Sequence, residues 1–207
     1  MKKLCFRMTL LIILGPVSLA VGAGGQDEIG PEAYRQYPEA LGGQAGEISG
    51  NGISYQQWID RTGVQLTGGI IYVPLSEAEL SWLDSTLDYN VGVELQFRIF
   101  GADLTSWLSG QLYAFFGLMH RGYIPIVEVE AGYYENEWDW IDGVYATGSF
   151  RPVVGLGGGI GTEIILFRHF SIPIEIGYSV NWSPLSGSLA DQFDVNLRPQ
   201  IGARYRY

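Results

Sequence analysis

The last fifteen residues of the chain, F-D-V-N-L-R-P-Q-I-G-A-R-Y-R-Y at positions 193–207, decide the fold. Every odd position from Phe193 to Tyr207 is apolar, and every even position is polar, charged or glycine. A period of two is the pattern of a β-strand whose two faces meet different surroundings. A helix would spread the apolar positions around its circumference, and Pro199 would interrupt it. The chain therefore ends on a long strand with an apolar face and a face that carries three arginines.

Seven earlier segments have the composition of strands. The clearest is residues 87–99, where apolar residues alternate strictly with polar residues and glycine. The others are residues 40–48, 53–59, 64–72, 106–119, 152–166 and 171–182. The sequence leaves the faces of the first two unassigned, and S-G-N-G at 49–52 predicts a hairpin turn between them. Short turns alternate with longer loops, except at this first connection, and the pattern predicts an all-β, eight-stranded antiparallel up-and-down barrel.

The position of charged residues decides which face of the strands is outside. Six charges lie in mid-strand, opposite the apolar faces: Glu94, Arg98, Glu163, Glu175, Arg198 and Arg204. A soluble barrel would turn these charges to water. The apolar faces, however, end in aromatic residues such as Tyr72, Trp182 and Tyr205, which membrane interfaces favour. We therefore predict a transmembrane β-barrel with the six charges inside, where they must pair. We expect the inward glycines of residues 155–161 to make room for a bulky neighbour or to let the strand bend.

The start of the chain has the layout of a secretory signal peptide. Basic residues precede a short apolar stretch, and small residues ending at Ala23 suit cleavage. We expect residues 1–23 to be the signal peptide, 24–37 a polar periplasmic lead-in, and 38–207 the barrel domain. Cys5 is the only cysteine, so we expect no disulfide and no thiolate metal site in the mature chain. That chain has nine arginines, no lysine and 22 acidic residues, and this net charge of −13 argues against a nucleic-acid partner.

The end of the chain carries a second signal. Gln200, Gly202, Tyr205 and Tyr207 match the C-terminal pattern by which the barrel-assembly machinery recognises bacterial outer-membrane barrels. With the signal peptide and the eight strands, this pattern resembles the small eight-stranded bacterial outer-membrane β-barrel family. The resemblance implies integral insertion in the outer membrane, contact with its lipid and lipopolysaccharide, and passage through the assembly machinery. Members of such a family differ in function. We expect a monomer without a cofactor.

The sequence leaves three functions open. The first is a structural or surface-interaction role, with a charge-filled interior and an acidic extracellular loop at residues 128–142. That loop mixes six carboxylates with tyrosine and tryptophan, and we weigh a solvated hairpin against divalent-cation binding or a partner surface. The second is a narrow channel for water or small ions, should the inward charges leave a continuous path.

The third function is a lipid A-modifying enzyme. His169 and Ser171 have the His-x-Ser spacing of the lipid A deacylase family, whose nucleophile needs a base and an acidic orienting group. Here the motif lies in a predicted periplasmic turn, and Ser183 stands where the family has its glutamate. We therefore expect the protein not to be an enzyme, and we assign no catalytic, cofactor-binding or metal-binding residue.

Overall fold

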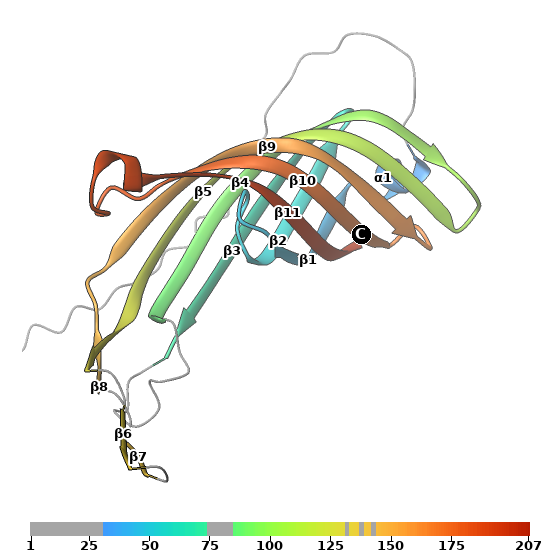
Figure 1. The fold of residues 1–207 in the computed structure, drawn as a ribbon. Coiled ribbons are helices and arrows are strands. Elements are labelled where there is room, and N and C mark those ends of the chain that lie inside the picture. The colour runs from blue at the N-terminus through green and yellow to red at the C-terminus, as the bar shows by residue number, and fades with distance from the viewer. Residues whose placement is uncertain (1–30, 74–84, 131–132, 137–138, 142–143) are drawn as a thin grey trace, which may run out of the picture.

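The computed structural model describes residues 31–73, 85–130, 133–136, 139–141 and 144–207. Eight strands in this part of the chain form a closed antiparallel ring (Figure 1). Their bounds are β1 Glu39–Ala45, β2 Gly52–Ile59, β3 Thr62–Tyr72, β4 Ser85–Asp103, β5 Leu108–Glu130, β9 Arg151–Leu166, β10 Phe170–Trp182 and β11 Phe193–Arg206. Each strand pairs with the next in this order, and β1 pairs with β11 to close the ring. The predicted eight-stranded up-and-down barrel is confirmed.

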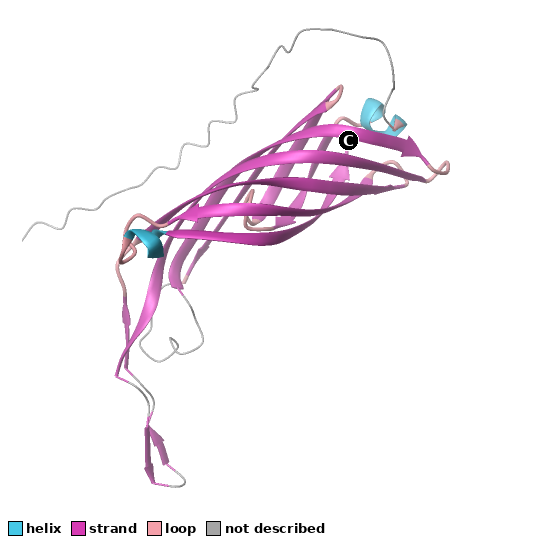
Figure 2. Ribbon diagram, turned by 45° about the horizontal axis from the view of Figure 1, so that its top comes forward, coloured by secondary structure: helices cyan, strands magenta, loops and turns pink. Residues whose placement is uncertain are grey.

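The ends of the barrel differ. At one end the turns are short, the chain terminates, and helix α1 (Glu32–Gln36) lies across the mouth (Figure 2). At the other end β5 continues beyond the ring and pairs with β8 (Val144–Thr147), and a further hairpin is formed by β6 (Tyr133–Asn136) and β7 (Asp139–Ile141). β5 extends the wall in this direction as far as Glu130. Most side chains of the acidic loop lie outside the described residues.

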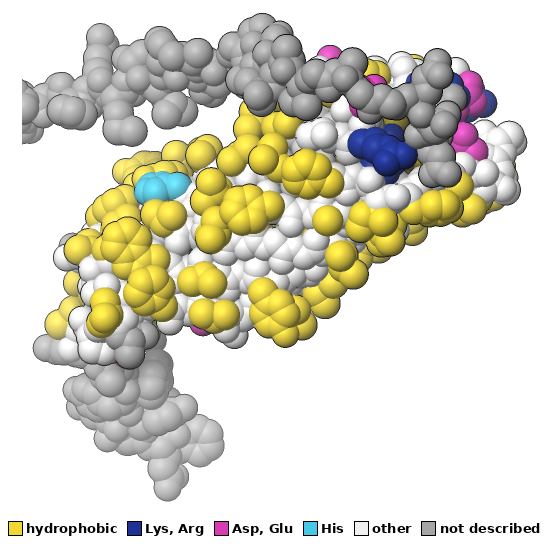
Figure 3. Space-filling model, turned by 90° about the horizontal axis from the view of Figure 1, so that it is seen from above, with side chains coloured by type: hydrophobic (Ala, Val, Ile, Leu, Met, Phe, Trp, Pro, Cys, Tyr) yellow, Lys and Arg dark blue, Asp and Glu magenta, His cyan; other side chains and the backbone are white. Residues whose placement is uncertain are grey.

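The outer surface of the barrel is apolar and its interior is polar. Apolar side chains point outward along every strand of the ring. Those more than half exposed include Ile70, Val91, Ile160, Tyr178 and Val195. Figure 3 shows hydrophobic side chains spread over one face of the barrel, with most of the visible charges at the α1 end. Glutamines, glutamates and arginines are buried instead. Among the described residues, no helix is long and apolar enough to cross a membrane.

Within the described part of the chain, the wall is incomplete between β11 and β3. The register of β1 with β11 ends at the pair Ala45 and Ile201, and β2 pairs with β3 only as far as Gly68. The prediction that the first strand continues to residue 48 is therefore wrong, because residues 46–51 turn into the lumen. If β1 continued by two residues, Glu47 would face Pro199, which has no N–H to donate to the strand ladder.

Candidate functional site

The helix α1 closes one mouth of the barrel. Tyr34 is buried, and its hydroxyl donates a hydrogen bond to Oε2 of Glu163 at 2.7 Å. Its ring meets Trp58 edge-on at 5.5 Å between centroids. Burial, together with the nearby Glu163 carboxylate, raises the pKa of Tyr34 well above its ordinary value. The segment expected to be a polar lead-in over residues 24–37 thus contributes, from residue 31 onward, a side chain to the interior network.

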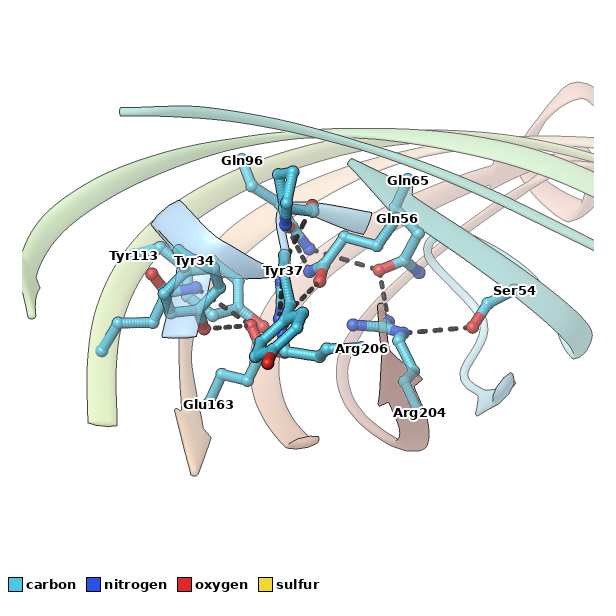
Figure 4. Close-up of polar contacts among 12 residues, drawn as sticks. Tyr34, Tyr37, Ser54, Gln56, Gln65, Gln96, Tyr113, Glu163, Arg204 and Arg206 are labelled. Atoms are coloured by element: carbon cyan, nitrogen blue, oxygen red, sulfur yellow. Dashed lines mark hydrogen bonds and ion pairs between the residues drawn. The ribbon is translucent and has the colours of Figure 1, made fainter. Parts of the chain in front are cut away.

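A buried ion pair lies beneath Tyr34 (Figure 4). Nη1 of Arg206 is 3.1 Å from Oε1 of Glu163, and neither side chain is exposed. Arg206 also donates to Oε1 of Gln56 at 3.0 Å and to the carbonyl oxygen of Tyr37 at 3.1 Å. Gln111 donates to the other oxygen of Glu163 at 2.9 Å. The pair joins β9 to the last residue of β11 and has further hydrogen bonds on both sides, as a buried pair requires.

Two more carboxylates are connected by one amide. Nε2 of Gln200 donates to Glu175 at 2.9 Å and lies 3.3 Å from Glu94. The hydroxyl of Tyr113 donates to Glu175 at 2.5 Å, and Gln96 donates to Glu94 at 2.6 Å. All five side chains are buried. This second cluster lies deeper in the lumen and connects four strands: β4, β5, β10 and β11.

The arginines predicted to lie inside have three different environments. Arg204 is buried and donates to Ser54 at 3.1 Å, to Gln44 at 2.7 Å and to Gln65. Arg98 is partly buried at the α1 mouth, with its guanidinium 4.8 Å from the ring centroid of Tyr34 and 4.9 Å from that of Trp58. Arg198 is partly exposed at the gap in the wall, where it pairs with Glu47 at 3.0 Å and Asp194 at 2.8 Å.

One interior charge is missing from the predicted set. Arg206 is fully buried, whereas the sequence analysis places only Arg198 and Arg204 of the last strand inside. The signal was present, because Arg206 is on the same alternating face as Arg204. The glutamines of β1 and β2 that complete the network, Gln44 and Gln56, were not predicted either, because the sequence left the faces of those two strands unassigned.

The turn between β1 and β2 fills the middle of the lumen. Ile48 and Ser49 are fully buried, and their backbone N–H groups donate to Oε1 of Gln200 at 3.1 and 3.0 Å. Glycines of three strands provide the space, because an added Cβ would come within about 3 Å of the Ile48 side chain at Gly117 (3.1 Å), Gly157 (2.8 Å) and Gly177 (3.1 Å). The expectation that glycine 157 makes room for a bulky neighbour is confirmed, and the neighbour is Ile48.

The residues of the C-terminal pattern divide between the two faces of β11. Gln200 points inward, as described above. At Gly202 an added Cβ would lie 2.4 Å from Oε1 of Gln44 and 2.8 Å from the carbonyl oxygen of Gly43, so a larger residue would have to displace backbone of β1 as well as the amide. Tyr205 and Tyr207 are about half exposed on the outer face. Their role as an assembly signal stays a prediction.

The His169 and Ser171 side chains have separate environments. Nδ1 of His169 is 2.9 Å from the carbonyl oxygen of Arg206, and its ring stacks on Tyr205 at 5.2 Å between centroids. Ser171 is buried on the lumen side. Neither of these two contacts of His169 is with a carboxylate that could orient the imidazole as a general base. Among the described residues there is also no cluster of three or more His, Cys, Asp or Glu that could hold a metal ion.

No family model and no curated protein matches the chain. Solved structures resemble it at low levels. The N-terminal β-barrel domain of Pseudomonas aeruginosa OprF has 9% identity and a TM-score of 0.45, over 82% of this chain and 95% of that one. Acinetobacter baumannii CarO has 15% identity and a TM-score of 0.35, over 83% and 98%. Ail, the attachment invasion locus protein of Yersinia pestis, has 16% identity and a TM-score of 0.32, over 82% and 96%.

What identifies a membrane barrel is therefore this chain's own surface. A closed ring satisfies the backbone hydrogen bonds of its paired strands, and apolar side chains cover its outside. Strands of 13 to 19 residues, such as β10 and β4, exceed the roughly 9–11 residues needed to span a bilayer. With short turns at one end and an extended hairpin at the other, this is the architecture of an integral outer-membrane β-barrel.

Proposed function

We propose that the protein is a closed outer-membrane barrel with a structural or surface-interaction role, inserted as a monomer among lipopolysaccharide and exposing an acidic loop outside the cell. The observation that carries this proposal is the obstruction of the lumen at two levels. Tyr34 from α1 and Ile48 from the β1–β2 turn are both less than 5% exposed inside the ring. A barrel with eight strands has space only for its own side chains, and here part of that space is taken by backbone.

The interior is arranged to be rigid. Each of the buried carboxylates Glu94, Glu163 and Glu175 accepts at least two side-chain hydrogen bonds. Because a buried polar group without a partner costs roughly 1–3 kcal/mol, opening a path through this network would be unfavourable. A static network of this kind ties strands together and supports a scaffold better than it supports conduction.

The long hairpin supports the surface role. β5 has 23 residues and continues past the end of β9, where it pairs with β8. The described strands β6 and β7 lie beyond this arm, away from the ring (Figures 1 and 2). The sequence of this region, residues 128–142, has six carboxylates. An arm that ends in a segment rich in acidic and aromatic residues suits contact with a partner or bridging by divalent cations.

Planar-bilayer conductance tests the closed barrel against the channel. The refolded mature chain, checked by heat-dependent gel migration, should give no steady unitary currents. A matched variant replaces residues 46–50 by Asn-Gly, which continues the β1–β2 hairpin as a tight turn with Ala45 opposite Asn51 and removes Ile48 from the lumen. We expect that variant to conduct more often than the wild type. Steady wild-type currents that change when Arg98 or Glu163 is neutralised would establish the channel instead.

A further inference from the structure

The gap in the wall between β11 and β3 leaves two strand edges without a neighbour among the described residues. The N–H of Tyr207 donates to the carbonyl oxygen of Glu39, so the odd-numbered residues of β11 point their backbone groups toward β1. Those of Phe193, Val195 and Leu197 therefore point into the gap, beyond the part of β11 that pairs with β1. Figure 1 shows the β1–β2 hairpin stopping short of both neighbours.

The other free edge belongs to β3. The N–H of Val73 donates to the carbonyl oxygen of Thr86, which precedes β3's partner residues in β4, so the even-numbered residues of β3 point their backbone groups the other way. Those of Ile70 and Tyr72 enter the gap, because β2 pairs with β3 only as far as Gly68. Three antiparallel pairings connect β11 to β3 through β1 and β2, so the two edges run in opposite directions.

The two edges are also level with each other. The row of paired residues that starts at Ala203 and passes through all eight strands returns to β11 at Phe193, ten positions farther from the α1 end. In a regular barrel, three of the eight steps between strands account for about four of these positions. Gly68 is therefore level with about residue 199 of β11, and the free residues of β3 are level with residues 195–197.

Both edges lie in the hydrocarbon of the membrane. Tyr205 marks the interface at the α1 end. With a rise of about 3.3 Å per residue and a tilt of about 45°, Leu197 and Val195 lie about 19 and 23 Å above it, within an apolar band about 25 Å tall. Hydrocarbon supplies no hydrogen bonds, so strand edges do not stay exposed to it. A polypeptide backbone supplies donors and acceptors at the spacing that these edges require.

The gap has the width of two strands, because β1 and β2 both end below it. Residues 193–197 are exposed on both faces of β11, and Ile71 is 67% exposed although it lies on the lumen face of β3. A strand antiparallel to β11 and a second strand antiparallel to β3 run in opposite directions to each other. The occupant that pairs with both edges is therefore a β-hairpin.

The base of the gap suits the turn of such a hairpin. A cavity of about 270 Å³ lies there, and its lining includes Gly46, Glu47 and Asn51 of the inward turn and Arg198 and Pro199 of β11. Nε of Arg198 is buried and has no hydrogen-bond partner within the described ranges, and a turn offers carbonyl oxygens to it. Pro199 has no N–H, so a turn beside it leaves no donor of that residue unpaired.

The side chains beside the gap indicate the composition of the hairpin. On the lumen face of β11, Asp194 and the neighbouring Glu47 share one arginine, Arg198, and the two carboxylate side chains are 54% and 50% exposed. Two carboxylates with one cation favour a basic residue in the strand beside β11. Ile71 favours an apolar residue in the strand beside β3, and lipid favours apolar residues on the outer face of both strands.

We propose that the gap binds a β-hairpin of a partner polypeptide, which pairs with β11 on one side and with β3 on the other. The hairpin enters from the outer end of the barrel, and its turn rests on the inward turn of residues 46–51. The inference goes beyond the role proposed for the acidic loop, and it rests on the closed outer-membrane barrel proposed above.

Disulfide trapping with a synthetic hairpin tests this pairing. Opposite residues of an antiparallel pair are about 5.5 Å apart at Cα, which a disulfide can bridge. The chain from residue 24 onward has no cysteine, so single cysteines are placed by Val195→Cys at one edge, Ile70→Cys at the other and Leu156→Cys in a closed part of the wall. Each variant is refolded into phosphatidylcholine vesicles and checked by heat-dependent migration, and Leu197→Cys is the second variant for the β11 edge.

The probe is a peptide of two strands of about five residues each, joined by Asn-Gly. Its outward positions are valine, and its inward positions are leucine in the first strand, which descends beside β3, and lysine in the second strand, which ascends beside β11. One form has a single cysteine on the outward face of the first strand, and another form has it on that of the second strand. A control form is N-methylated along the free edge of the second strand, which removes its donors to β11.

We expect the second-strand cysteine to form a disulfide with Val195→Cys about tenfold faster than with Leu156→Cys or Ile70→Cys, because paired strands hold the two thiols at a high effective concentration. The first-strand cysteine should prefer Ile70→Cys by a similar factor. N-methylation should lower the rate at Val195→Cys to the rate at Leu156→Cys.

Equal rates at all three positions, or an unchanged rate with the N-methylated form, would mean that the peptide only partitions into the bilayer, and would overturn the hairpin site. Disulfides between Val195→Cys and Ile70→Cys chains without peptide would assign the gap to a second copy, and would overturn it too. Steady currents from the wild type would refute the closed lumen without changing the trapping ratios. Loss of heat-dependent migration in the wild type would overturn the barrel and the hairpin site together.

Discussion

The buried pair of Glu163 and Arg206 should contribute far more to stability than a pair on the surface. At 3.1 Å between charged atoms, an effective dielectric constant of about 20 gives a Coulomb attraction of about 5 kcal/mol. Desolvation of both groups opposes this attraction, so the pair itself adds much less than that. Removing one partner, however, leaves the other charge buried and uncompensated, which typically costs about 3–5 kcal/mol.

A double-mutant cycle separates these effects. Glu163→Gln and Arg206→Met keep side-chain volume and remove one charge each, and the double variant removes both. We expect each single variant to lower the free energy of unfolding by about 3–5 kcal/mol, and the double variant to cost less than their sum by at least about 2 kcal/mol. The measurement is urea unfolding in lipid vesicles, followed by tryptophan fluorescence.

The matched control is the pair of Arg168 and Glu32 near the same mouth. Their side chains are 41% and 38% exposed, so their coupling energy should be about 0.2–1 kcal/mol. If the Glu163–Arg206 coupling were as small as that of the control, the interior would be hydrated rather than closed. The proposal of a rigid, plugged lumen would then fail.

Three further changes have expected outcomes. Gly42→Ala should prevent closure between β1 and β11, because its Cβ would meet backbone atoms of β11, the nearest at 2.0 Å, and heat-dependent migration should be lost. The control is Gly43→Ala, whose Cβ would be 3.7 Å from its nearest atom and which should behave as wild type. Tyr34→Phe should lower the free energy of unfolding in urea by about 1–3 kcal/mol, because it leaves a buried carboxylate oxygen with one donor fewer. Hydrogen bonds from Ser188 lower the pKa of Asp191 in the folded protein. This cap therefore stabilises the turn fully above the pKa of Asp191 in the unfolded chain, and the stabilisation is lost as the pH falls through the pKa of Asp191 in the folded protein. Ser188→Ala should raise the pKa of Asp191 in an NMR titration.

The strands could be predicted because, in a membrane barrel, residues that face the lipid alternate with residues that face the lumen, and this gives the sequence a period of two. Residues 87–99 and 193–207 alternate without a break, and the structure has β4 and β11 there. The same alternation correctly separated inward Glu94 and Glu175 from the outward apolar residues, as their burial shows. Boundaries were less accurate at the Gly-rich first strand, where alternation is weak.

The plug, which is the inward turn of residues 46–51, could not be predicted in the same way, because a turn that folds into the lumen has no periodic pattern in the sequence. Residues 46–51 have the composition of an ordinary surface hairpin, and Glu47 and Asn51 suggest solvent. Tyr34 is equally inconspicuous in a polar segment. In both cases burial depends on what the distant strands leave open, which is a property of the closed ring. Two indirect signs existed: a short first connection where a long one is due, and Pro199 in the strand that faces it.

The plug and the gap have one structural cause. The β1–β2 hairpin is too short to reach the outer edge of the wall, and the residues that would have extended it fill the lumen instead. Inward glycines at 117, 157 and 177 keep room for Ile48, and Pro199 removes the donor that would hold a longer β1 in place. A variant with Pro199→Val and a larger residue at Gly117, where the three atoms nearest to an added Cβ all belong to Ile48, should therefore move the turn into the wall and close the gap. Protection from amide exchange at Leu197 and Val195 would report that change, and unchanged exchange there would show that the plug and the gap are independent.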